Sequence, residues 1–197
     1  MPSAPESPRR EHHEIVVVRH GETEWSLAGR HTSRTDLPLT ERGRERAGAL
    51  RPTLAGWRFA LVLCSPLRRA RETCELAGYG EVAELCGDLH EWDYGEYEGL
   101  TTAQIRERDP DWSLWREGCP GGETPPQVGA RAERALERLR AADGSALAFA
   151  HGHILRVLAG HWLVMDTSFG SRLALSAGGV GVLGWEHKTE VLSRWNV

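Results

Sequence analysis

Residues 14–23 read Glu14-Ile15-Val16-Val17-Val18-Arg19-His20-Gly21-Glu22-Thr23, and this stretch decides the fold. The run of β-branched residues after Glu14 predicts a strand that is buried on both faces, as in a parallel sheet. Sheets of that kind bind ligands beyond the carboxyl ends of their strands, where helix N-termini also point. Arg19, His20 and Gly21 follow the strand directly, so we expect them to lie in a binding site.

Two further buried strands are predicted, and each of them ends in the same way. Phe59–Cys64 runs into Ser65-Pro66-Leu67-Arg68-Arg69, and Ala146–Ala150 runs into His151-Gly152-His153. If the strands share one sheet, one pocket collects Arg19, His20, Arg69 and His151. Two guanidiniums, two imidazoles and free backbone N–H groups are the donors that bind a phosphate group.

Taken singly, each of these residues also has a structural explanation. A histidine after a strand is more often a hydrogen-bonded structural residue than a nucleophile, and Arg68 with Arg69 would suit a solvated helix start. Gly21 and Gly152 could serve turns alone. The coincidence of these residues at three strand ends is what favours a phosphate site.

Helical patterns alternate with the strands, which predicts an α/β fold. We expect a three-layer α/β/α sandwich with a mainly parallel central sheet. Residues 14–197 are expected to form one domain with a small cap or loop insertion around 88–123, after a disordered lead-in over 1–13. Gly21–Leu39 is expected to be a loop. Ser65-Pro66 is expected to start a helix, with Ser65 as its N-cap. Further helices are expected over 40–54, 101–115 (two short ones), 124–142 and 153–164, and further strands over 82–86, 173–175, 180–185 and 191–195.

Composition excludes several classes of protein. The chain has 197 residues, 40% of them hydrophobic, with 24 basic and 28 acidic side chains and a net charge of −4. That charge gives no general attraction to nucleic acid or to an anionic membrane. No apolar run approaches the ~18 residues of a membrane span, and the N-terminus has no apolar core of a signal peptide. The four cysteines form no CxxC pair, so we expect reduced thiols in a cytoplasmic protein.

Several motifs together resemble the histidine phosphatase superfamily, in its phosphoglycerate mutase-like branch. Within that superfamily the chain looks most similar to actinobacterial acid phosphatases and to fungal sedoheptulose bisphosphatase. The resemblance spans residues 14 to about 187 and implies a phosphoglycerate mutase-like fold and phosphoryl transfer with no metal and no cofactor. The motifs that carry it are Arg19-His20-Gly21-Glu22-Thr23, residues 29–32, 35–40, 65–73 and 91–99, Gly121-Gly122-Glu123-Thr124, residues 149–153 and residues 177–182.

The resemblance implies a role for each residue of the predicted pocket. His20 would attack phosphorus and form a phosphohistidine. Arg19, Arg69 and a protonated His151 would stabilise the charge on the phosphoryl oxygens. Metal ions would not be needed, because these cationic side chains take the place of magnesium.

Glu91 matches the general acid of the family. It would protonate the leaving oxygen and then activate the water that hydrolyses the phosphoenzyme. Asp93 and Glu96 lie nearby in the sequence, and each of the three could instead be a solvated carboxylate. The resemblance further implies contacts to phosphate or substrate by Thr23, Thr32 and Gly152.

The chain departs from the mutases of the family in ways that favour hydrolysis. The asparagine that mutases carry three residues after the Glu of the first motif is absent, because Trp25-Ser26 stands in that stretch, and His153 replaces an asparagine after the second His-Gly. The chain is also too short for the longer mutase insertion and tail. Arg156 and His187 match positions that would hold a second phosphate in sugar-bisphosphatase relatives, although they could equally be a helix-surface cation and an edge-strand residue.

We therefore expect metal-independent hydrolysis of a small phosphorylated metabolite, with a sugar bisphosphate as a candidate. The alternatives on the same machinery are a phosphoglycerate mutase and a protein phosphohistidine phosphatase. Two other classes are a metallohydrolase built on His151-Gly152-His153 and a phospho-ligand binding module without activity. The partners expected are a small phosphorylated substrate and a second copy of the chain in a homodimer, with no nucleic acid and no membrane.

Overall fold

A computed structural model describes residues 13–197 of the chain. The lead-in expected over residues 1–13 lies outside the described residues except for its last position. The described part folds around a six-stranded sheet of order β3-β2-β4-β1-β5-β6. The strands are β1 (Ile15–Arg19), β2 (Phe59–Cys64), β3 (Glu84–Leu85), β4 (Ser145–Ala150), β5 (Val180–Glu186) and β6 (Thr189–Trp195).

The sheet is mixed, with its parallel part where the site was predicted. β4 pairs in parallel with β1 on one side and with β2 on the other. β5 is antiparallel to β1, and β6 is antiparallel to β5. The carboxyl ends of β1, β4 and β2 are therefore neighbours, and the predicted α/β fold class is confirmed.

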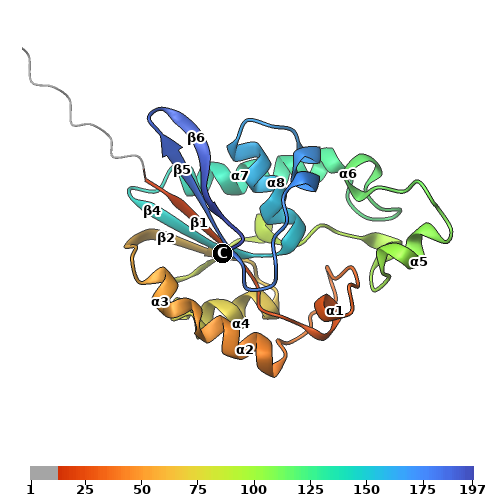
Figure 1. Cartoon of the computed structure of the whole chain (residues 1–197), viewed down its shortest axis with the longest axis horizontal. Coiled ribbons are helices and arrows are strands. Elements are labelled where there is room, and N and C mark those ends of the chain that lie inside the picture. Colours follow the sequence, from red (N-terminus) through yellow and green to blue (C-terminus); the bar gives the residue numbers. More distant parts are fainter. Residues whose placement is uncertain (1–12) are drawn as a thin grey trace, which may run out of the picture.

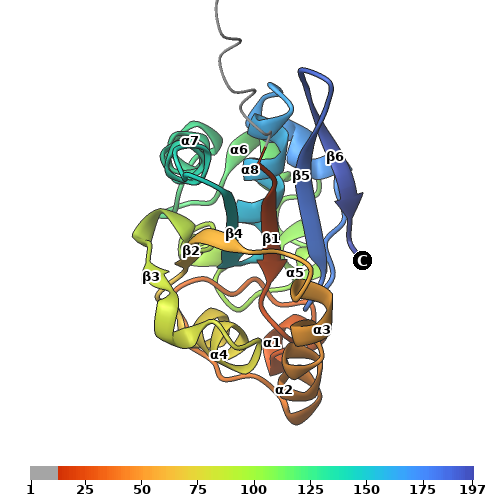
Figure 2. The same ribbon diagram turned by 90° about the vertical axis from the view of Figure 1, so that its left-hand side faces the viewer.

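Helices cover both faces of the sheet (Figures 1 and 2). One layer contains α2 (Glu41–Gly48), α3 (Leu50–Leu54) and α4 (Arg68–Leu76), and the other contains α7 (Pro125–Arg140) and α8 (Gly152–Trp162). Alternate residues of β1 enter the two cores: Val16 and Val18 pack with the α3 and α4 side, Ile15 and Val17 with the α7 and α8 side. All four are buried, which explains the continuous apolar run in the sequence.

A lobe beyond the strand ends carries α5 (Thr102–Arg106) and α6 (Leu114–Glu117), shown in green in Figure 1. It is joined to the loop after α1 (Glu24–Leu27) by an antiparallel bridge between Arg30 and Thr101. Backbone hydrogen bonds from His31 N to Leu100 O and from Gly99 N to His31 O continue this contact. The loop and the lobe therefore enclose the space beyond the strand ends together.

The expected helix over 40–54 is two helices, α2 and α3, that meet at Ala49. Pro52 explains the break, because a proline has no N–H to donate to the carbonyl of Gly48, four residues earlier. The expected loop Gly21–Leu39 contains the short helix α1, which Thr23 caps. The structure corrects both predictions.

The expected start of α4 and the expected strand 173–175 are also wrong. Leu67 is the N-cap of α4, which begins at Arg68. No strand includes residues 173–175, because the carbonyl groups of Ala174 and Leu175 accept hydrogen bonds from the side chains of Trp195 and Arg19. The hydroxyl oxygen of Ser65, the expected N-cap, lies 2.7 Å from Nε2 of His151.

Among residues 13–197 there is no helix with the length and hydrophobicity needed to span a bilayer.

Candidate active site

His20 lies immediately beyond β1 and is almost fully buried. Its Nδ1 atom is 2.7 Å from the carbonyl oxygen of Gly21, which can only accept a hydrogen bond. The ring proton therefore sits on Nδ1, and Nε2 carries the free lone pair. Burial, and then the charges of Arg19 and Arg69, lower the pKa of His20 well below its usual value. The structure thus holds a neutral imidazole with one nucleophilic nitrogen.

The turn after His20 is fixed by close packing against α2. A Cβ atom on Gly21 would lie 2.6 Å from the carbonyl oxygen of Gly43, and a Cβ on Gly43 would lie 2.2 Å from the carbonyl oxygen of Glu22. The N–H of Gly21 donates to Oγ1 of Thr73, whose hydroxyl donates to the carbonyl of Arg69. Glycine is required at both packing positions, and α4 is tied to the turn that holds the imidazole.

Two arginines supply positive charge around His20: Arg69, which is fully buried, and Arg19, which is partly buried. The guanidinium of Arg69 donates to the carbonyl groups of Thr32, Ser33 and Thr35, and that of Arg19 donates to Leu175 O. The Nε atoms of both arginines are buried and have no hydrogen-bond partner among the described residues. Buried N–H groups normally find a partner, so these two are suited to an anion.

His151 lies beside His20, with ring centroids 5.1 Å apart. Its Nε2 atom is 2.7 Å from Oγ of Ser65, and its Nδ1 atom is buried without a partner in the described chain. Burial, followed by the charge of Arg69, lowers the pKa of His151 well below its usual value. The protonated form expected from the sequence therefore requires a bound anion.

Glu91 reaches the N-terminus of α8 and accepts backbone hydrogen bonds there. Its Oε1 atom accepts from Trp92 N at 2.9 Å and Ile154 N at 3.0 Å, and its Oε2 atom accepts from His153 N at 3.0 Å. Free N–H groups at a helix N-terminus favour an anion. The carboxylate is thereby fixed in orientation at the edge of the cavity.

Sequence reasoning missed the residues that hold these groups in place. Arg131 of α7 donates to both carboxylate oxygens of Glu123 and to the carbonyls of Asp88 and His90. Glu123 in turn accepts from the N–H of Asp93. This network anchors the segment that carries Glu91. Glu123 belongs to the motif Gly121–Thr124, which the sequence shows. Its partner Arg131 on α7 can be identified only from the structure.

A second missed residue, Glu98, orients the loop that holds Arg69. Its carboxylate accepts from the N–H groups of Ser33 and Thr35 at 2.9–3.0 Å. The carbonyls of the same residues accept from the Arg69 guanidinium. Glu98 therefore fixes the direction of the carbonyl groups that position this arginine.

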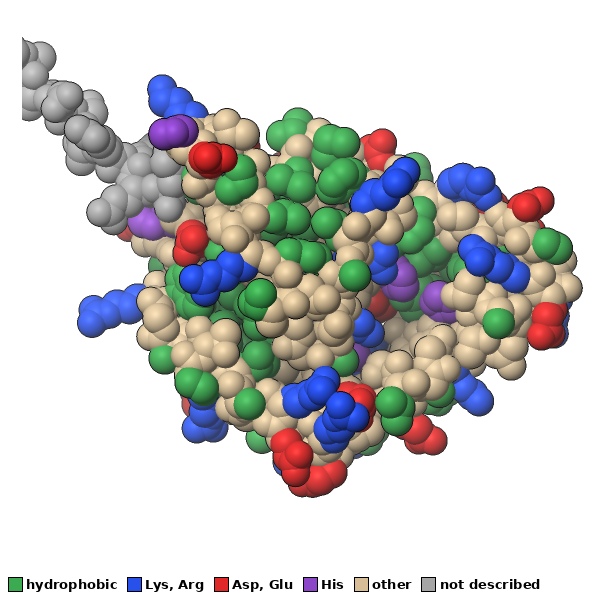
Figure 3. Space-filling model, viewed as in Figure 1, with side chains coloured by type: hydrophobic (Ala, Val, Ile, Leu, Met, Phe, Trp, Pro, Cys, Tyr) green, Lys and Arg blue, Asp and Glu red, His purple; other side chains and the backbone are tan. Residues whose placement is uncertain are grey.

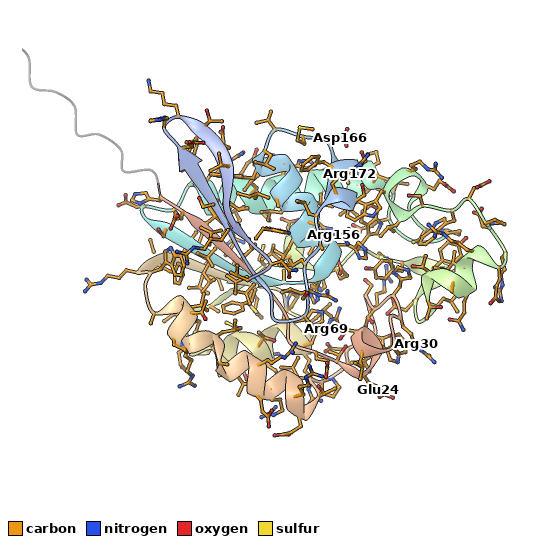
Figure 4. All side chains as sticks on the ribbon, in the orientation of Figure 1. Glu24, Arg30, Arg69, Arg156, Asp166 and Arg172 are labelled. Atoms are coloured by element: carbon orange, nitrogen blue, oxygen red, sulfur yellow. The ribbon has the colours of Figure 1, made fainter. Side chains whose placement is uncertain are left out.

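A cavity of about 160 Å³ opens beyond the strand ends. Figure 3 shows it as a hollow beside the lobe in which basic and histidine side chains gather, and Figure 4 labels Arg30, in the loop after α1, and Arg156, on α8. Arg69 and His151 are fully buried and do not belong to the lining of this cavity. The residues that line it are Arg19, His20, Ser26, Gly29, Arg30, His31, Thr32, Glu91, Tyr94, Gly152, His153 and Arg156.

The structure brings most of the predicted residues together. Thr32, Gly152 and Arg156 line the cavity with Glu91, whereas Asp93 and Glu96 do not. A Cβ atom on Gly152 would lie 3.2 Å from the Arg19 guanidinium carbon, so a small residue is needed there.

Two predicted residues lie elsewhere. Thr23 is fully buried and caps α1 through Ser26, outside the lining of the cavity. His187 is exposed in the turn between β5 and β6, with φ of 55°. Because β5 runs antiparallel to β1, this turn lies at the opposite end of the sheet from His20. The prediction that His187 contacts a second phosphate is wrong.

No group of three or more His, Cys, Asp or Glu residues within 13–197 is arranged to hold a metal ion. His151 and His153 are separated by one residue, Gly152, but contact different partners, Ser65 and Tyr94. The metallohydrolase alternative therefore has no ligand set in the described chain.

Comparison with known proteins adds independent information. Residues 15–197 match the model of the histidine phosphatase superfamily (branch 1). An acid phosphatase of Mycobacterium tuberculosis (strain ATCC 25618 / H37Rv) is 43% identical over 187 residues, covering 92% of this chain and 91% of that protein. Sedoheptulose 1,7-bisphosphatase of Saccharomyces cerevisiae is 36% identical over 181 residues, covering 75% of this chain and 66% of the yeast protein.

A solved structure of an open reading frame product from Mycobacterium tuberculosis has the same fold. It superposes with a TM-score of 0.90 at 41% identity, covering 94% of this chain and 97% of that one. The similarity therefore extends over the sheet, both helix layers and the lobe.

Proposed function

Because the chain belongs to branch 1 of the histidine phosphatase superfamily, we propose that it hydrolyses small phosphomonoesters through a phosphohistidine on His20. The observation that carries this proposal is the hydrogen bond between Nδ1 of His20 and the Gly21 carbonyl. It leaves the lone pair on Nε2, and the Nε atoms of Arg19 and Arg69 have no hydrogen-bond partner within residues 13–197. A neutral nucleophile beside fixed cationic donors is suited to attack a phosphate dianion.

In the first step Nε2 of His20 bonds to phosphorus while the bond from phosphorus to the leaving oxygen breaks. Arg19 and Arg69 stabilise the charge on the transferred group. His151 lies 5.1 Å from His20 between centroids and becomes a cationic donor when the bound phosphate offsets the cost of its burial. The product of this step is a phosphohistidine and an alcohol.

Glu91 is the proton donor of this proposal, because it alone among Glu91, Asp93 and Glu96 lines the cavity. In its protonated form it gives its proton to the leaving oxygen. The resulting carboxylate then takes a proton from water, which attacks phosphorus and releases inorganic phosphate and free His20. The backbone donors of α8 stabilise the carboxylate in this second step.

The cavity supports a small substrate with a second anionic group. Its volume of about 160 Å³ suits a metabolite rather than a protein segment, and Arg30 and Arg156 line it in addition to Arg19. The Arg156 guanidinium lies 4.7 Å from the Trp115 ring centroid and donates through Nε to Gly170 O. It is thereby held at the cavity, which favours the interpretation of Arg156 as a substrate contact over that of a surface cation. A sugar bisphosphate fits this charge pattern.

The decisive experiment measures phosphate release from p-nitrophenyl phosphate between pH 4 and 8, with EDTA present, for wild type and His20→Ala. We expect activity in wild type and loss of at least about 1,000-fold in the variant, because covalent catalysis is removed. Activity that EDTA abolishes would contradict the histidine mechanism. An inactive wild type that interconverts 2- and 3-phosphoglycerate would indicate the mutase alternative.

A protein phosphohistidine phosphatase is tested by adding a phosphohistidine-containing protein to the same assay. A substrate panel with Arg156→Ala tests the second anionic group: loss should be larger for sugar bisphosphates than for the monophosphates. Binding of phosphate without turnover would indicate the binding module. Independence from metal, a cytoplasmic location and a homodimer stay predictions, the second of them resting on four buried free cysteines.

A further inference from the structure

His153 lines the cavity but is not one of the side chains expected to bind the transferred phosphate. It lies in the first turn of α8, and its ring centroid is 5.8 Å from that of Tyr94 and 6.1 Å from that of His31. The Tyr94 hydroxyl oxygen is 2.6 Å from Nδ1 of His153. Both residues line the cavity.

The position of the shared proton follows from what each group can accept and donate. Tyr94 is buried, and its hydroxyl has no other partner among the described residues. Burial raises the pKa of Tyr94 and lowers the pKa of His153 well away from their usual values, so both groups are neutral near pH 7. A neutral imidazole accepts at one nitrogen only. The phenol therefore donates to Nδ1, and the ring proton of His153 sits on Nε2.

Glu91 does not compete for a proton on Nδ1. Its Oε2 atom is 3.8 Å from Nδ1, which is beyond hydrogen-bond distance. The same oxygen already accepts from the backbone N–H of His153 at 3.0 Å. Tyr94 is therefore the group that determines the tautomer of His153.

The Nε2 atom of His153 faces the cavity. It has no hydrogen-bond partner in residues 13–197 and does not belong to the buried unpartnered atoms there. The side chain is 21% exposed and lines the cavity. Its N–H is therefore available to a ligand.

Arg156 also lines the cavity and presents further hydrogen-bond donors to it. The ring of Trp115 packs against both residues, at 5.3 Å from the His153 centroid and 4.7 Å from the Arg156 guanidinium carbon. Among residues 13–197, only Nε of this arginine donates a hydrogen bond, to Gly170 O. His153 and Arg156 are called the donor wall of the cavity, and together they offer a neutral N–H and a guanidinium. Both groups donate hydrogen bonds and neither accepts them.

We propose that Tyr94 is a positioning residue that fixes His153 as an Nε2–H donor, and that His153 and Arg156 together bind an anionic oxygen group on the leaving-group side of the substrate. The inference rests on the proposed phosphatase function. It gives His153 and Arg156 the role of selecting substrates that carry a second anionic group. A hydroxyl group could accept from the donor wall but would gain little from the guanidinium charge. A phosphate or a carboxylate takes hydrogen bonds from both residues.

The kinetic test compares kcat/KM for fructose 1,6-bisphosphate and for 3-phosphoglycerate with kcat/KM for p-nitrophenyl phosphate, which has no second anionic group. His153→Leu should lower both ratios, or one of them, about tenfold, as expected for loss of one hydrogen bond to a charged group. His153→Gln, whose amide N–H can reach the place of Nε2–H, should restore most of the loss. A fall for the bisphosphate alone identifies a phosphate, and a fall for 3-phosphoglycerate alone identifies a carboxylate.

Tyr94→Phe should lower the same ratios by raising KM for the anionic substrates rather than by lowering kcat. Without the Tyr94 hydroxyl, His153 carries its proton on Nε2 in only part of the molecules. Tyr97→Phe is the matched control: Tyr97 lies on the same segment, packs on Trp112 and does not line the cavity. It should leave the ratios unchanged. Ratios that are the same in wild type, His153→Leu and Tyr94→Phe would overturn the proposal.

A measurement without turnover separates this proposal from the proposed function. Long-range ¹⁵N–¹H correlation spectra distinguish the two imidazole tautomers, and the signals of His153 are those missing in His153→Gln. We expect Nε2–H in wild type and in Tyr97→Phe, and a mixture in Tyr94→Phe. An Nδ1–H tautomer in wild type would overturn the proposal even if the enzyme is an active phosphatase. If the proposed phosphatase function is wrong, the His20→Ala variant should instead keep its activity.

Discussion

The rings of His20 and His151 lie with centroids 5.1 Å apart, and both are buried against the same two arginines. Two imidazoles in this position cannot both be charged without a bound anion, because burial and the guanidinium charges oppose protonation. We therefore expect both histidines to be neutral in the free enzyme. His151 is expected to become protonated only when the phosphate group of the substrate is bound.

This arrangement predicts how stability depends on pH. His20, His151 and His153 have a pKa well below 6.5 in the folded protein, and burial lowers the pKa of His31 to about 4. The unfolded chain then binds more protons below pH 6.5, so the free energy of unfolding is highest above that pH. It should fall as the pH is lowered, by up to about 1.4 kcal/mol per pH unit for each histidine.

Urea denaturation without phosphate at pH 7.5, 6.5 and 5.5 measures this dependence. His31→Gln should make it shallower, and added phosphate should also do so by compensating charge on His151. A free energy of unfolding that is constant from pH 7.5 to 5.5 would contradict the expectation.

Ser65→Ala removes the hydroxyl that lies 2.7 Å from Nε2 of His151. Since this leaves a buried nitrogen unpaired, we expect a loss of about 1–3 kcal/mol in stability. We also expect kcat for p-nitrophenyl phosphate to fall about tenfold, because His151 is no longer held in orientation. Ser65→Thr keeps a hydroxyl and should restore part of both. An unchanged kcat in Ser65→Ala would show that this contact is structural only.

Two glycines of α2 provide a matched pair. Gly43→Ala places a Cβ 2.2 Å from the Glu22 carbonyl, so the backbone after His20 must shift, with an expected cost of about 1–3 kcal/mol and reduced kcat. Gly48→Ala meets nothing within 4 Å and should stabilise the helix by up to about 1 kcal/mol. Thermal unfolding and phosphatase assays of both variants test the difference. Equal effects would disprove the close packing of the turn.

Arg131→Met tests the anchor of the Glu91 segment. The guanidinium of Arg131 is largely buried and pairs with Glu123 at 2.7 Å, so we expect loss of about 2–4 kcal/mol and a kcat reduced at least tenfold. Arg134→Met is its control on the same helix, since Arg134 pairs with Asp88 at the exposed surface. Its effect should lie within experimental error. A control as damaging as Arg131→Met would show that the loss is not specific to the anchor.

The sequence indicated the centre of the site because its residues directly follow buried apolar runs, which can be recognised in the sequence alone. The buried runs before Arg19 and before His151 could be recognised without any partner, and the parallel pairing of β1 with β4 brought their ends together. The Arg131–Glu123 pair could not be found that way, because it depends on where α7 crosses the segment of Glu91. The role of His187 was implied by the resemblance to sugar bisphosphatases alone, and the antiparallel β5 carries this residue to the other end of the sheet.

The strand order β2-β4-β1 has a consequence for how the protein is made. β4 lies between two strands that precede it by more than 80 residues, and it supplies the strand end that leads into His151. During synthesis on a ribosome, β1 and β2 emerge long before the strand that joins them. A chain interrupted before residue 150 would therefore leave two unsatisfied strand edges and an incomplete set of phosphate donors. Catalytic capacity should appear late and all at once in synthesis, so an abortive fragment would pose an aggregation hazard without any capacity to hydrolyse a metabolite.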